Sequence, residues 1–361
     1  MAELGIYLHW PYCKSKCPYC DFFSLVNPKV KQEEIINDYL QQLDQYRDML
    51  GKRCIKSVFF GGGTPSLITA DNIARVLDKI NFLWGIDDKT EISLEANPNT
   101  NSQDMFSDLK RAGVNRLSLG IQSLLDEDLR FLGRTHNAAQ ARQAIEDMRR
   151  YFTNCSIDLI YALPNQSNDR WLEQLEQVAN LGLKHISLYQ LTIEEGTIFA
   201  RRNVKPMAEE QAAELYVATE DFLANKGFNK YEVSNYSLPD YESRHNLIYW
   251  QGGEYIGIGD SAQGRIRIKE KWYAQTNHLR LEEINNYERA EELVIMGLRL
   301  VSGINKELFA KLCGINWNDF VNHSFVQTAV EQGWLIDNKK TIKASKEGFL
   351  ILNKLIEGLC S

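Results

Sequence analysis

The sequence predicts an α/β fold in which residues 1–240 form a partial, TIM-like (β/α)6 barrel. Two observations favour this fold. Short runs rich in β-branched and aromatic residues alternate with longer stretches of helical periodicity, which is typical of parallel strands joined by helical crossovers. Polar residues and glycines follow the ends of the runs, and that edge of a parallel sheet is where ligands bind. Six such units would nearly close a barrel, whereas eight complete one.

The predicted elements divide the chain into two domains. Strands are expected at residues 4–10, 55–60, 91–96, 115–120, 155–161 and 185–191, and helices at 31–50, 69–84, 102–112, 137–151, 169–181 and 208–226. A segment rich in glycine and aromatic residues follows at 243–268, before helix-like stretches at 286–300, 305–312, 317–332 and 346–358 and a short hairpin of 334–336 and 341–344. We therefore predict a barrel domain, 1–240, and a small helical, winged-helix-like C-terminal domain, 241–361.

Composition and charge exclude several classes of protein. The 361 residues are 44% hydrophobic and 25% charged, which is ordinary for a globular protein. Winged-helix shapes can bind DNA, but residues 282–361 hold nine Lys and Arg against eleven Asp and Glu, and the net charge is −7. We therefore expect no nucleic-acid partner. The chain shows no apolar run near the ~20 residues of a membrane span and no signal peptide, so we expect a cytoplasmic protein without a transmembrane segment.

The cysteines point to a metal site rather than to disulfides. Of seven cysteines, Cys54, Cys155, Cys313 and Cys360 are scattered singly, which does not resemble a disulfide framework. The other three, Cys13, Cys17 and Cys20, lie in CKSKCPYCDF directly after the first predicted strand. A closed zinc site takes four ligands. Three thiolates can instead bind three irons of an iron–sulfur cube and leave the fourth iron open to a small molecule.

Further polar residues follow the other strands of the predicted barrel. GGGTP (61–65) comes after the second strand, Glu95 ends the third, Gln122 follows the fourth, and Asp158 lies in the fifth. No single one of these signals is specific. Because they share the same edge of the sheet, together they predict a site at the mouth of the barrel.

The cysteine motif and several other segments resemble a known family. C-x3-C-x2-C after the first barrel strand resembles the radical S-adenosylmethionine (SAM) superfamily, which implies a [4Fe-4S] cluster whose open iron is chelated by SAM. YLHWPYCKSKCPYCDF, FGGGTPS, LEANP, SLGIQS, FLGRTH and HNLIYW resemble the group that contains oxygen-independent coproporphyrinogen III oxidase and the HemW haem chaperones. Phe22 stands where the oxidase has a further cysteine. HNLIYW matches the H-N-x-x-Y-W motif of HemW. Because Cys13 lies so near the start, we also expect the oxidase's extra N-terminal segment to be absent. The resemblance therefore favours the HemW branch and implies a C-terminal domain of the same group.

The resemblance also implies the residues of the SAM pocket. Chemically, Glu95 can accept hydrogen bonds from the amine of SAM, Arg134 can pair with its carboxylate, and Asp158 can accept from the ribose hydroxyls. Without the resemblance, the two acids could equally be helix caps or salt-bridge partners, and Arg134 could be a solvated loop charge. The full implied set is Tyr7, Phe22, Gly62, Gly63, Thr64, Glu95, Gln122, Arg134 and Asp158.

The resemblance also implies haem as cargo, with His245 as a candidate ligand. Neutral imidazole is a common axial ligand of haem iron, and Tyr249 and Trp250 could stack on the macrocycle. The alternative is that HNLIYW is a structural motif that docks the small domain on the barrel. One departure stands in GIGDSAQG (257–264), where Gln263 replaces the family's usual histidine and cannot act as an imidazole ligand.

Two classes of function follow from these features. The first is a haem chaperone that carries a [4Fe-4S] cluster and SAM and delivers haem to acceptor haem proteins, with membrane-associated respiratory enzymes as candidate acceptors. The second is an enzyme, either a coproporphyrinogen III oxidase that decarboxylates propionate side chains or another radical SAM enzyme of unknown substrate. Phe22 argues against the oxidase activity, and we assign no catalytic residue.

Overall fold

The computed structural model describes residues 2–27, 30–98 and 104–361. Its largest element is a curled sheet with the strand order β14-β13-β12-β11-β1-β4-β5-β6-β7-β8-β10-β9. The six central strands run parallel to their neighbours: β1 (Glu3–Trp10), β4 (Cys54–Gly62), β5 (Glu91–Ala96), β6 (Arg116–Gln122), β7 (Cys155–Tyr161) and β8 (His185–Gln190). These strands confirm the predicted partial (β/α)6 barrel.

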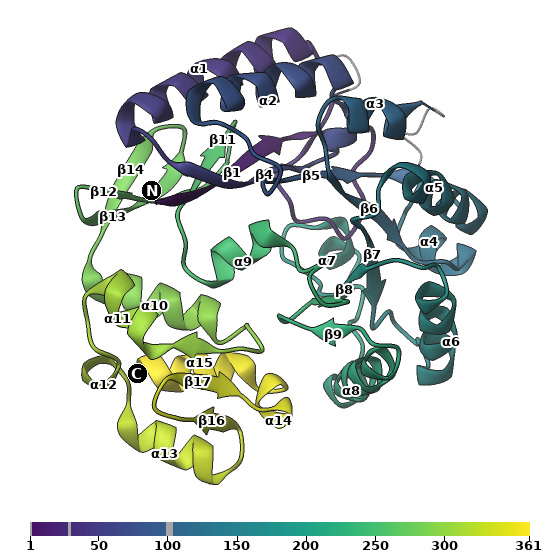
Figure 1. The fold of residues 1–361 in the computed structure, drawn as a ribbon. Coiled ribbons are helices and arrows are strands. Elements are labelled where there is room, and N and C mark those ends of the chain that lie inside the picture. Colours follow the sequence, from purple (N-terminus) through teal and green to yellow (C-terminus); the bar gives the residue numbers. More distant parts are fainter. Residues whose placement is uncertain (1, 28–29, 99–103) are drawn as a thin grey trace.

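Helices follow the parallel strands and cover the outside of the curled sheet (Figure 1). Several begin at side-chain caps, for example Thr69, Ser167 and the capping box of Asn137 with Gln140, which satisfy the first free N–H groups of α2, α6 and α5. The helices are α1 (Gln32–Leu50), α2 (Ala70–Trp84), α3 (Met105–Arg111), α4 (Asp126–Phe131), α5 (Ala138–Tyr151), α6 (Asn168–Ala179), α7 (Ile198–Arg201) and α8 (Glu209–Asn225).

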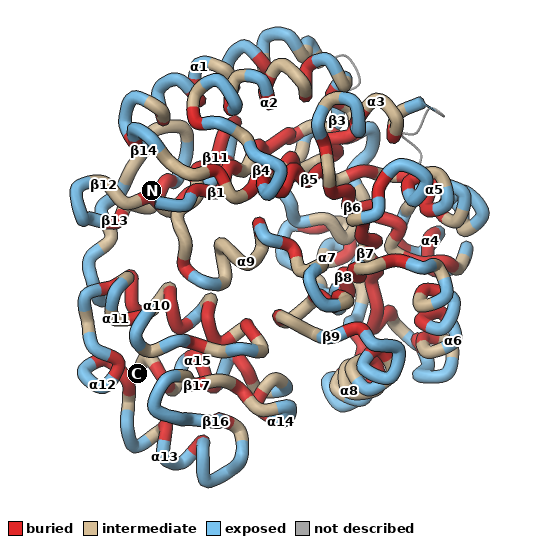
Figure 2. The backbone as a smooth tube through the Cα atoms, viewed as in Figure 1, coloured by how far each residue is buried: buried red, intermediate tan, exposed pale blue. Residues whose placement is uncertain are grey.

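The two faces of the sheet differ in polarity. Along β1, Leu4, Ile6 and Leu8 are buried in the main core under the helices. The alternate residues face the inside of the barrel, where the Tyr7 ring stacks near the Phe59 ring of β4 at 6.1 Å between centroids. Figure 2 shows the strands largely in the colour of buried residues and the outer helix faces exposed. Polar side chains inside the barrel must therefore find partners there or in a ligand.

The sheet continues past its parallel part on both sides. β11 (Tyr255–Ile258) pairs in parallel with β1, and β12 (Gly264–Ile268), β13 (Lys271–Asn277) and β14 (Arg280–Ile284) follow antiparallel. At the other edge, β10 (Asn235–Ser237) is antiparallel to β8, and β9 (Asn229–Lys230) is antiparallel to β10. Strands from both sides of the predicted domain boundary at 240/241 therefore share one sheet, and the boundary stays a prediction.

The C-terminal region has a hydrophobic core of its own. Its buried cluster begins at Ala290 and includes Phe309, Trp317 and Leu355. It consists of α10 (Asn286–Gly297), α11 (Lys306–Cys313), α12 (Trp317–Phe320), α13 (His323–Glu331), α14 (Lys346–Phe349), α15 (Leu352–Cys360) and a sheet of β15 (Ile304–Asn305), β17 (Thr341–Ala344) and β16 (Leu335–Asp337). Mostly helical with a small sheet, it confirms the predicted helical C-terminal region.

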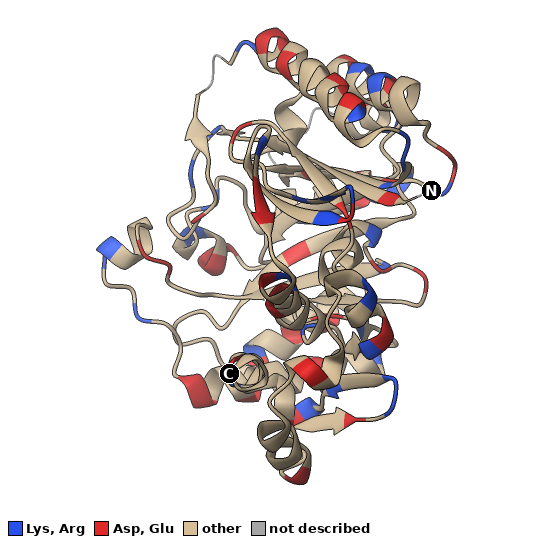
Figure 3. Ribbon diagram, turned by 90° about the vertical axis from the view of Figure 1, so that its left-hand side faces the viewer, with Lys and Arg blue, Asp and Glu red and all other residues tan. Residues whose placement is uncertain are grey.

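The distribution of charged residues and the length of the helices are relevant to the expected nucleic-acid and membrane partners. Figure 3 shows basic and acidic residues interspersed along the chain in that view. Within the described residues, the structure contains no helix that combines the length and the apolar character needed to cross a bilayer. The expected absence of a nucleic-acid partner stays a prediction.

A short helix, α9 (Arg244–Trp250), contains HNLIYW and lies between the barrel strands and the C-terminal region (Figure 1). The carboxylate of Glu91 at the start of β5 accepts hydrogen bonds from its first backbone N–H groups, from Arg244 at 3.0 Å and His245 at 3.1 Å. Arg116 at the start of β6 lies 3.9 Å from the same carboxylate, and both side chains are only 3% exposed. The helix is therefore held at the N-terminal end of the parallel strands by a buried charge pair.

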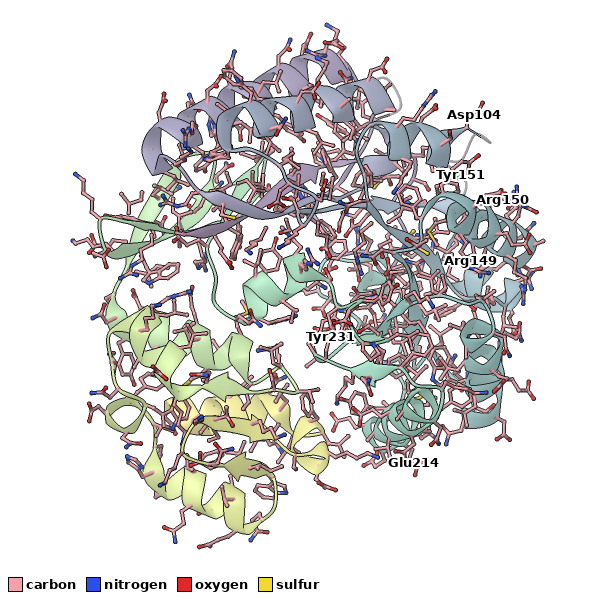
Figure 4. The ribbon with its side chains drawn as sticks, viewed as in Figure 1. Asp104, Arg149, Arg150, Tyr151, Glu214 and Tyr231 are labelled. Carbon is pink, nitrogen blue, oxygen red and sulfur yellow. The ribbon has the colours of Figure 1, made fainter. Side chains whose placement is uncertain are left out.

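Two histidines complete the polar network at this end of the barrel. His245 Nδ1 lies 2.6 Å from Ser57 Oγ of β4, and His185 Nδ1 lies 2.7 Å from Ser156 Oγ of β7. The hydroxyl of Tyr231, labelled in Figure 4 between the barrel and the C-terminal region, lies 2.8 Å from His185 Nε2. The Tyr231 carbonyl also accepts a hydrogen bond from the C-terminal region, which ties that region to the base of the barrel.

We expect Glu91→Ala to lower the free energy of unfolding by about 3–5 kcal/mol, because it leaves the Arg116 charge buried and the first N–H groups of α9 unsatisfied. The measurement is urea unfolding followed by circular dichroism. Glu34→Ala is the control, since Glu34 forms an exposed pair with Lys31 and should cost less than about 1 kcal/mol. Equal stability of the two variants would contradict the role given to Glu91.

Candidate functional site

A cavity of about 350 Å³ opens at the C-terminal end of the parallel strands. This volume lies within the range of small-molecule sites, which is roughly 300–1,000 Å³. The cavity brings together most of the residues predicted from the sequence: Cys13, Cys17, Cys20, Phe22, Gly62, Gly63, Thr64, Glu95, Gln122, Arg134 and Asp158. Tyr7 and His245 are not in its lining.

The three cysteines enter from the loop after β1. Cys13 ends β2 (Tyr12–Cys13), which pairs with β3 (Leu25–Val26), and a turn joins Cys17 to Cys20. Cys13 is buried, whereas Cys17 and Cys20 are half-buried. No three His, Cys, Asp or Glu side chains within the described part of the chain are arranged to hold a single metal ion. An iron–sulfur cube has a different requirement, because each thiolate binds its own iron.

Glycine is required where β4 meets the cysteine loop. Gly62 has φ +112°, a conformation that other residues rarely adopt. A Cβ atom on Gly63 would lie 2.8 Å from the Tyr12 carbonyl oxygen and 3.0 Å from Cys13 Sγ. The glycines therefore let the end of β4 lie directly against the first cysteine and leave backbone groups at the cavity wall.

Two carboxyl groups face the cavity from β5 and β7. Burial and, to a smaller extent, the nearby Asp158 together raise the pKa of Glu95 to about 8, although a hydrogen bond from Gly62 N opposes the rise. Burial also raises the pKa of Asp158, although Ser118 Oγ donates a hydrogen bond to it at 2.9 Å. A ligand that brings positive charge or hydrogen-bond donors would relieve both groups.

Gln122 and Arg134 supply unsatisfied polar atoms at the same place. Gln122 sits at an irregularity in the pairing of β6 with β7 and has φ +60°. Its Oε1 and the Nε of Arg134 are buried and have no hydrogen-bond partner among the described residues. An acceptor and a donor left open in one cavity wall fit a ligand with complementary polar groups. Arg134 is thus part of the cavity wall, and the alternative of a solvated loop charge does not hold.

Tyr7 lies deeper in the barrel, away from the cavity lining. Its hydroxyl is 3.0 Å from His9 Nδ1, and burial, with Glu95 as a second cause, raises its pKa well above the ordinary value. The sequence resemblance groups Tyr7 with the SAM pocket. In the structure, the ring centroids of Tyr7 and His245 lie 6.3 Å apart, and the place of Tyr7 in the SAM pocket stays a prediction.

His245 is 1% exposed, and both of its ring nitrogens have partners, Ser57 on one side and Tyr249 on the other. Burial, with a smaller effect of Arg116, lowers its pKa to about 3, so the ring is neutral. This conformation offers no free imidazole nitrogen to haem iron and agrees with the structural alternative for HNLIYW. The haem-ligand role of His245 stays a prediction. Gln263 is exposed in the turn between β11 and β12.

The cavity lining also contains residues that the sequence reasoning missed, among them Tyr19, Asn97 and Tyr189. Tyr19 lies between two of the cysteines, and its hydroxyl accepts a hydrogen bond from Arg134 Nη1 at 3.5 Å. Asn97 follows Glu95 by two residues, so the period of a strand places it on the same face. That period could have identified Asn97, and the position of Tyr19 inside the cysteine motif could have identified it.

The raised pKa of Glu95 predicts how stability depends on pH. Between its ordinary value of 4.5 and about 8, the folded protein holds a proton that the unfolded chain releases, so stability falls as the pH rises through this range. Glu95→Gln removes this loss. We therefore compare the Tm of the variant with that of the wild type, both without cofactors. The difference in Tm, variant minus wild type, should be larger at about pH 8.5 than at about pH 5. The same gain at both pH values would refute the assignment, and Glu34→Gln is the matched exposed control.

Two family models match the chain. The Radical SAM superfamily model covers residues 7–178, and the HemN C-terminal domain model covers residues 284–351. The first match contains the cysteine loop and all other residues of the predicted SAM set.

Full-length relatives carry the same combination of regions. The Heme chaperone HemW proteins of Haemophilus influenzae and Escherichia coli are 33% and 32% identical to the chain, and each comparison covers 99% of this chain and 98% of the relative. Radical S-adenosyl methionine domain-containing protein 1, mitochondrial, of Bos taurus is 34% identical, over 99% of this chain and 87% of its own length.

A solved structure shows the same fold. Coproporphyrinogen III oxidase (HemN) from Escherichia coli, described as a radical SAM enzyme, superposes with a TM-score of 0.82 and 21% identity over 100% of this chain and 90% of its own. The fold, the matched regions and the full-length relatives agree: the chain belongs to the HemW group of the radical SAM superfamily.

Proposed function

We propose that this protein is a haem chaperone that binds haem and delivers it to acceptor haem proteins. The observation that carries the proposal is the full-length similarity, at 32–33% identity, to proteins named Heme chaperone HemW, against 21% for the oxidase structure. Phe22 supports it, because the oxidase resemblance requires a cysteine there. Phe22 is 63% exposed at the cavity rim, where a phenylalanine ring offers an apolar surface and no metal ligand.

We further propose that Cys13, Cys17 and Cys20 hold a [4Fe-4S] cluster and that SAM binds beside it. When bound, the two cofactors supply one-electron chemistry, while the protein supplies position and charge. The backbone at Gly62, Gly63 and Thr64 allows close approach of the ligand. Glu95 accepts from the SAM amine, Arg134 Nε donates to the carboxylate, Gln122 Oε1 accepts from a ligand donor, and Asp158 accepts from the ribose hydroxyls.

The haem site is proposed at HNLIYW. Trp250, its last residue, lines a second cavity of about 350 Å³ between α9 and the C-terminal region. The walls of this cavity are mostly apolar and include Leu293, Leu300 and Phe309, which suits a macrocycle. For His245 to reach haem iron, α9 must turn out of the base of the barrel and break the contact between His245 and Ser57.

The alternative function is an oxidase-like radical SAM enzyme that decarboxylates propionate side chains of coproporphyrinogen III. The complete set of polar groups in the main cavity keeps this alternative open, since a carrier has less need of SAM. We expect the reconstituted wild type to form no vinyl product from coproporphyrinogen III with SAM and a reductant under anaerobic conditions. The control is Cys17→Ala. More vinyl product from the wild type than from this control would favour the oxidase-like function and would contradict the proposal that haem delivery is the only activity.

The haem proposal predicts opposite effects for two substitutions at one contact. Titration of the reconstituted protein with haem should give a saturable Soret band in the wild type. His245→Ala should weaken binding by about ten-fold or more, because it removes the ligand. Ser57→Ala should retain or tighten binding, because it removes the partner with which haem iron competes for Nδ1.

His278→Ala is the control, since His278 is only half-buried and its ring makes an exposed hydrogen bond with Gln45. Binding that is unchanged in His245→Ala would move the haem site away from this residue. No Soret change in the wild type would refute the haem carrier altogether.

A further inference from the structure

A hydrogen-bond chain in the cavity wall connects two of the three cysteines. Arg134 Nη1 donates to Cys17 Sγ at 3.3 Å, and Arg134 Nη2 donates to Asn97 Oδ1 at 2.5 Å. Asn97 Nδ2 donates to Thr64 Oγ1 at 3.2 Å, and Thr64 Oγ1 donates to Cys13 Sγ at 3.5 Å. The chain thus runs from one thiol to the other through three side chains: Thr64 and Asn97 follow the ends of β4 and β5, and Arg134 lies in the loop between α4 and α5.

The chemistry of the groups fixes the direction of the bonds at Arg134, and at the two sulfur atoms once the cysteines are thiolates, which can only accept. A guanidinium can only donate, so the carbonyl oxygen of Asn97 must face Arg134 and its NH2 group must face Thr64. Because the Thr64 oxygen accepts from Asn97, its own hydrogen is available to point at Cys13 Sγ. Both ends of the chain therefore donate to sulfur, and Asn97 is the residue that joins the two halves.

The surrounding backbone leaves room for this arrangement. A Cβ atom on Gly120 would lie 3.2 Å from Asn97 Oδ1 and 3.2 Å from Gln122 Nε2, and the Gly120 carbonyl accepts a second bond from Arg134 Nη2 at 2.8 Å. With both terminal nitrogens of Arg134 engaged, its buried Nε is the atom left without a partner among the described residues. Asn97 thereby determines which edge of the guanidinium remains for a ligand.

We propose that Asn97 is a positioning residue that aims Thr64 and Arg134 at the cluster thiolates and presents Arg134 Nε to the SAM carboxylate. The inference rests on the proposed cluster and SAM. Hydrogen bonds to cluster sulfurs are one of the factors that set the reduction potential, and donors favour the more negative, reduced state. Asn97 therefore raises the potential of the cluster and couples it to the group that binds SAM.

Asparagine is suited to this position because it both accepts and donates. An aspartate in its place would still accept from Arg134, but it could not donate to Thr64 and would add negative charge beside the cluster. Alanine would remove both bonds. The two substitutions Asn97→Asp and Asn97→Ala therefore separate the Arg134 half of the chain from the Thr64 half.

The test measures cluster content, midpoint potential and SAM affinity in anaerobically reconstituted protein. The potential is followed by electron paramagnetic resonance during a dye-mediated redox titration, and SAM affinity by equilibrium dialysis. Asn97→Ala should take up the cluster, shift the potential to more negative values and weaken SAM binding by about ten-fold or more, since a bond to a charged group is lost. Asn97→Asp should shift the potential further, yet keep SAM affinity closer to the wild type.

Asn115→Ala is the matched control. Asn115 also makes two amide hydrogen bonds, to Thr90 O and from Ile92 N, but at the opposite end of the strands. It should change stability without changing potential or SAM affinity. If both Asn97 variants kept wild-type potential and SAM affinity, the inference would be overturned, and Asn97→Asp keeps the test available if Asn97→Ala does not fold. A wild type that takes up no cluster would instead refute the proposed cofactor set.

Discussion

The buried pair of Glu91 and Arg116 is the contact on which the arrangement of this molecule depends. A curled parallel sheet whose inner face is polar needs a partner for that face at each end. At the N-terminal end of the strands the partner is α9, held by its backbone N–H groups on the Glu91 carboxylate. Arg116 balances this carboxylate in a place that water does not reach. The same contact fixes where HNLIYW lies and how the chain leaves the barrel toward the C-terminal region.

The opposite end of the barrel is built for a ligand instead of a helix. Glu95 and Asp158 are held in an environment that disfavours their charge, while an acceptor on Gln122 and a donor on Arg134 are left open. Buried polar groups without partners lower the stability of the ligand-free protein, and they gain hydrogen-bond partners when a ligand binds. The two ends of one barrel therefore use the same residue types differently, satisfied by the protein at the base and reserved for a cofactor at the mouth.

The barrel and most of the cavity residues could be predicted from the sequence, because their signals lie in short stretches of the chain. The parallel strands and the ligand-bearing edge follow from alternation and from glycines and acids at strand ends, as at Gly63 and Glu95. What could not be predicted depends on distant pairing. β11 joins β1 only because the chain returns after about 250 residues, and glycine-rich strands carry a weak pattern. The position of His245 against Ser57 is likewise a property of tertiary packing, so the motif suggested a ligand where the structure shows a satisfied side chain.

The pairing of β1 with β11 also has a consequence for how the chain becomes folded. β1 is synthesised about 250 residues before β11, so one of its two edges has no partner until residues 255–258 have been made. Contacts of such large sequence separation form slowly, and an unpaired strand edge invites pairing with other chains. Synthesis of the first 240 residues alone would leave that edge open and the base of the barrel without α9. A fragment cut there should therefore aggregate rather than behave as an independent barrel.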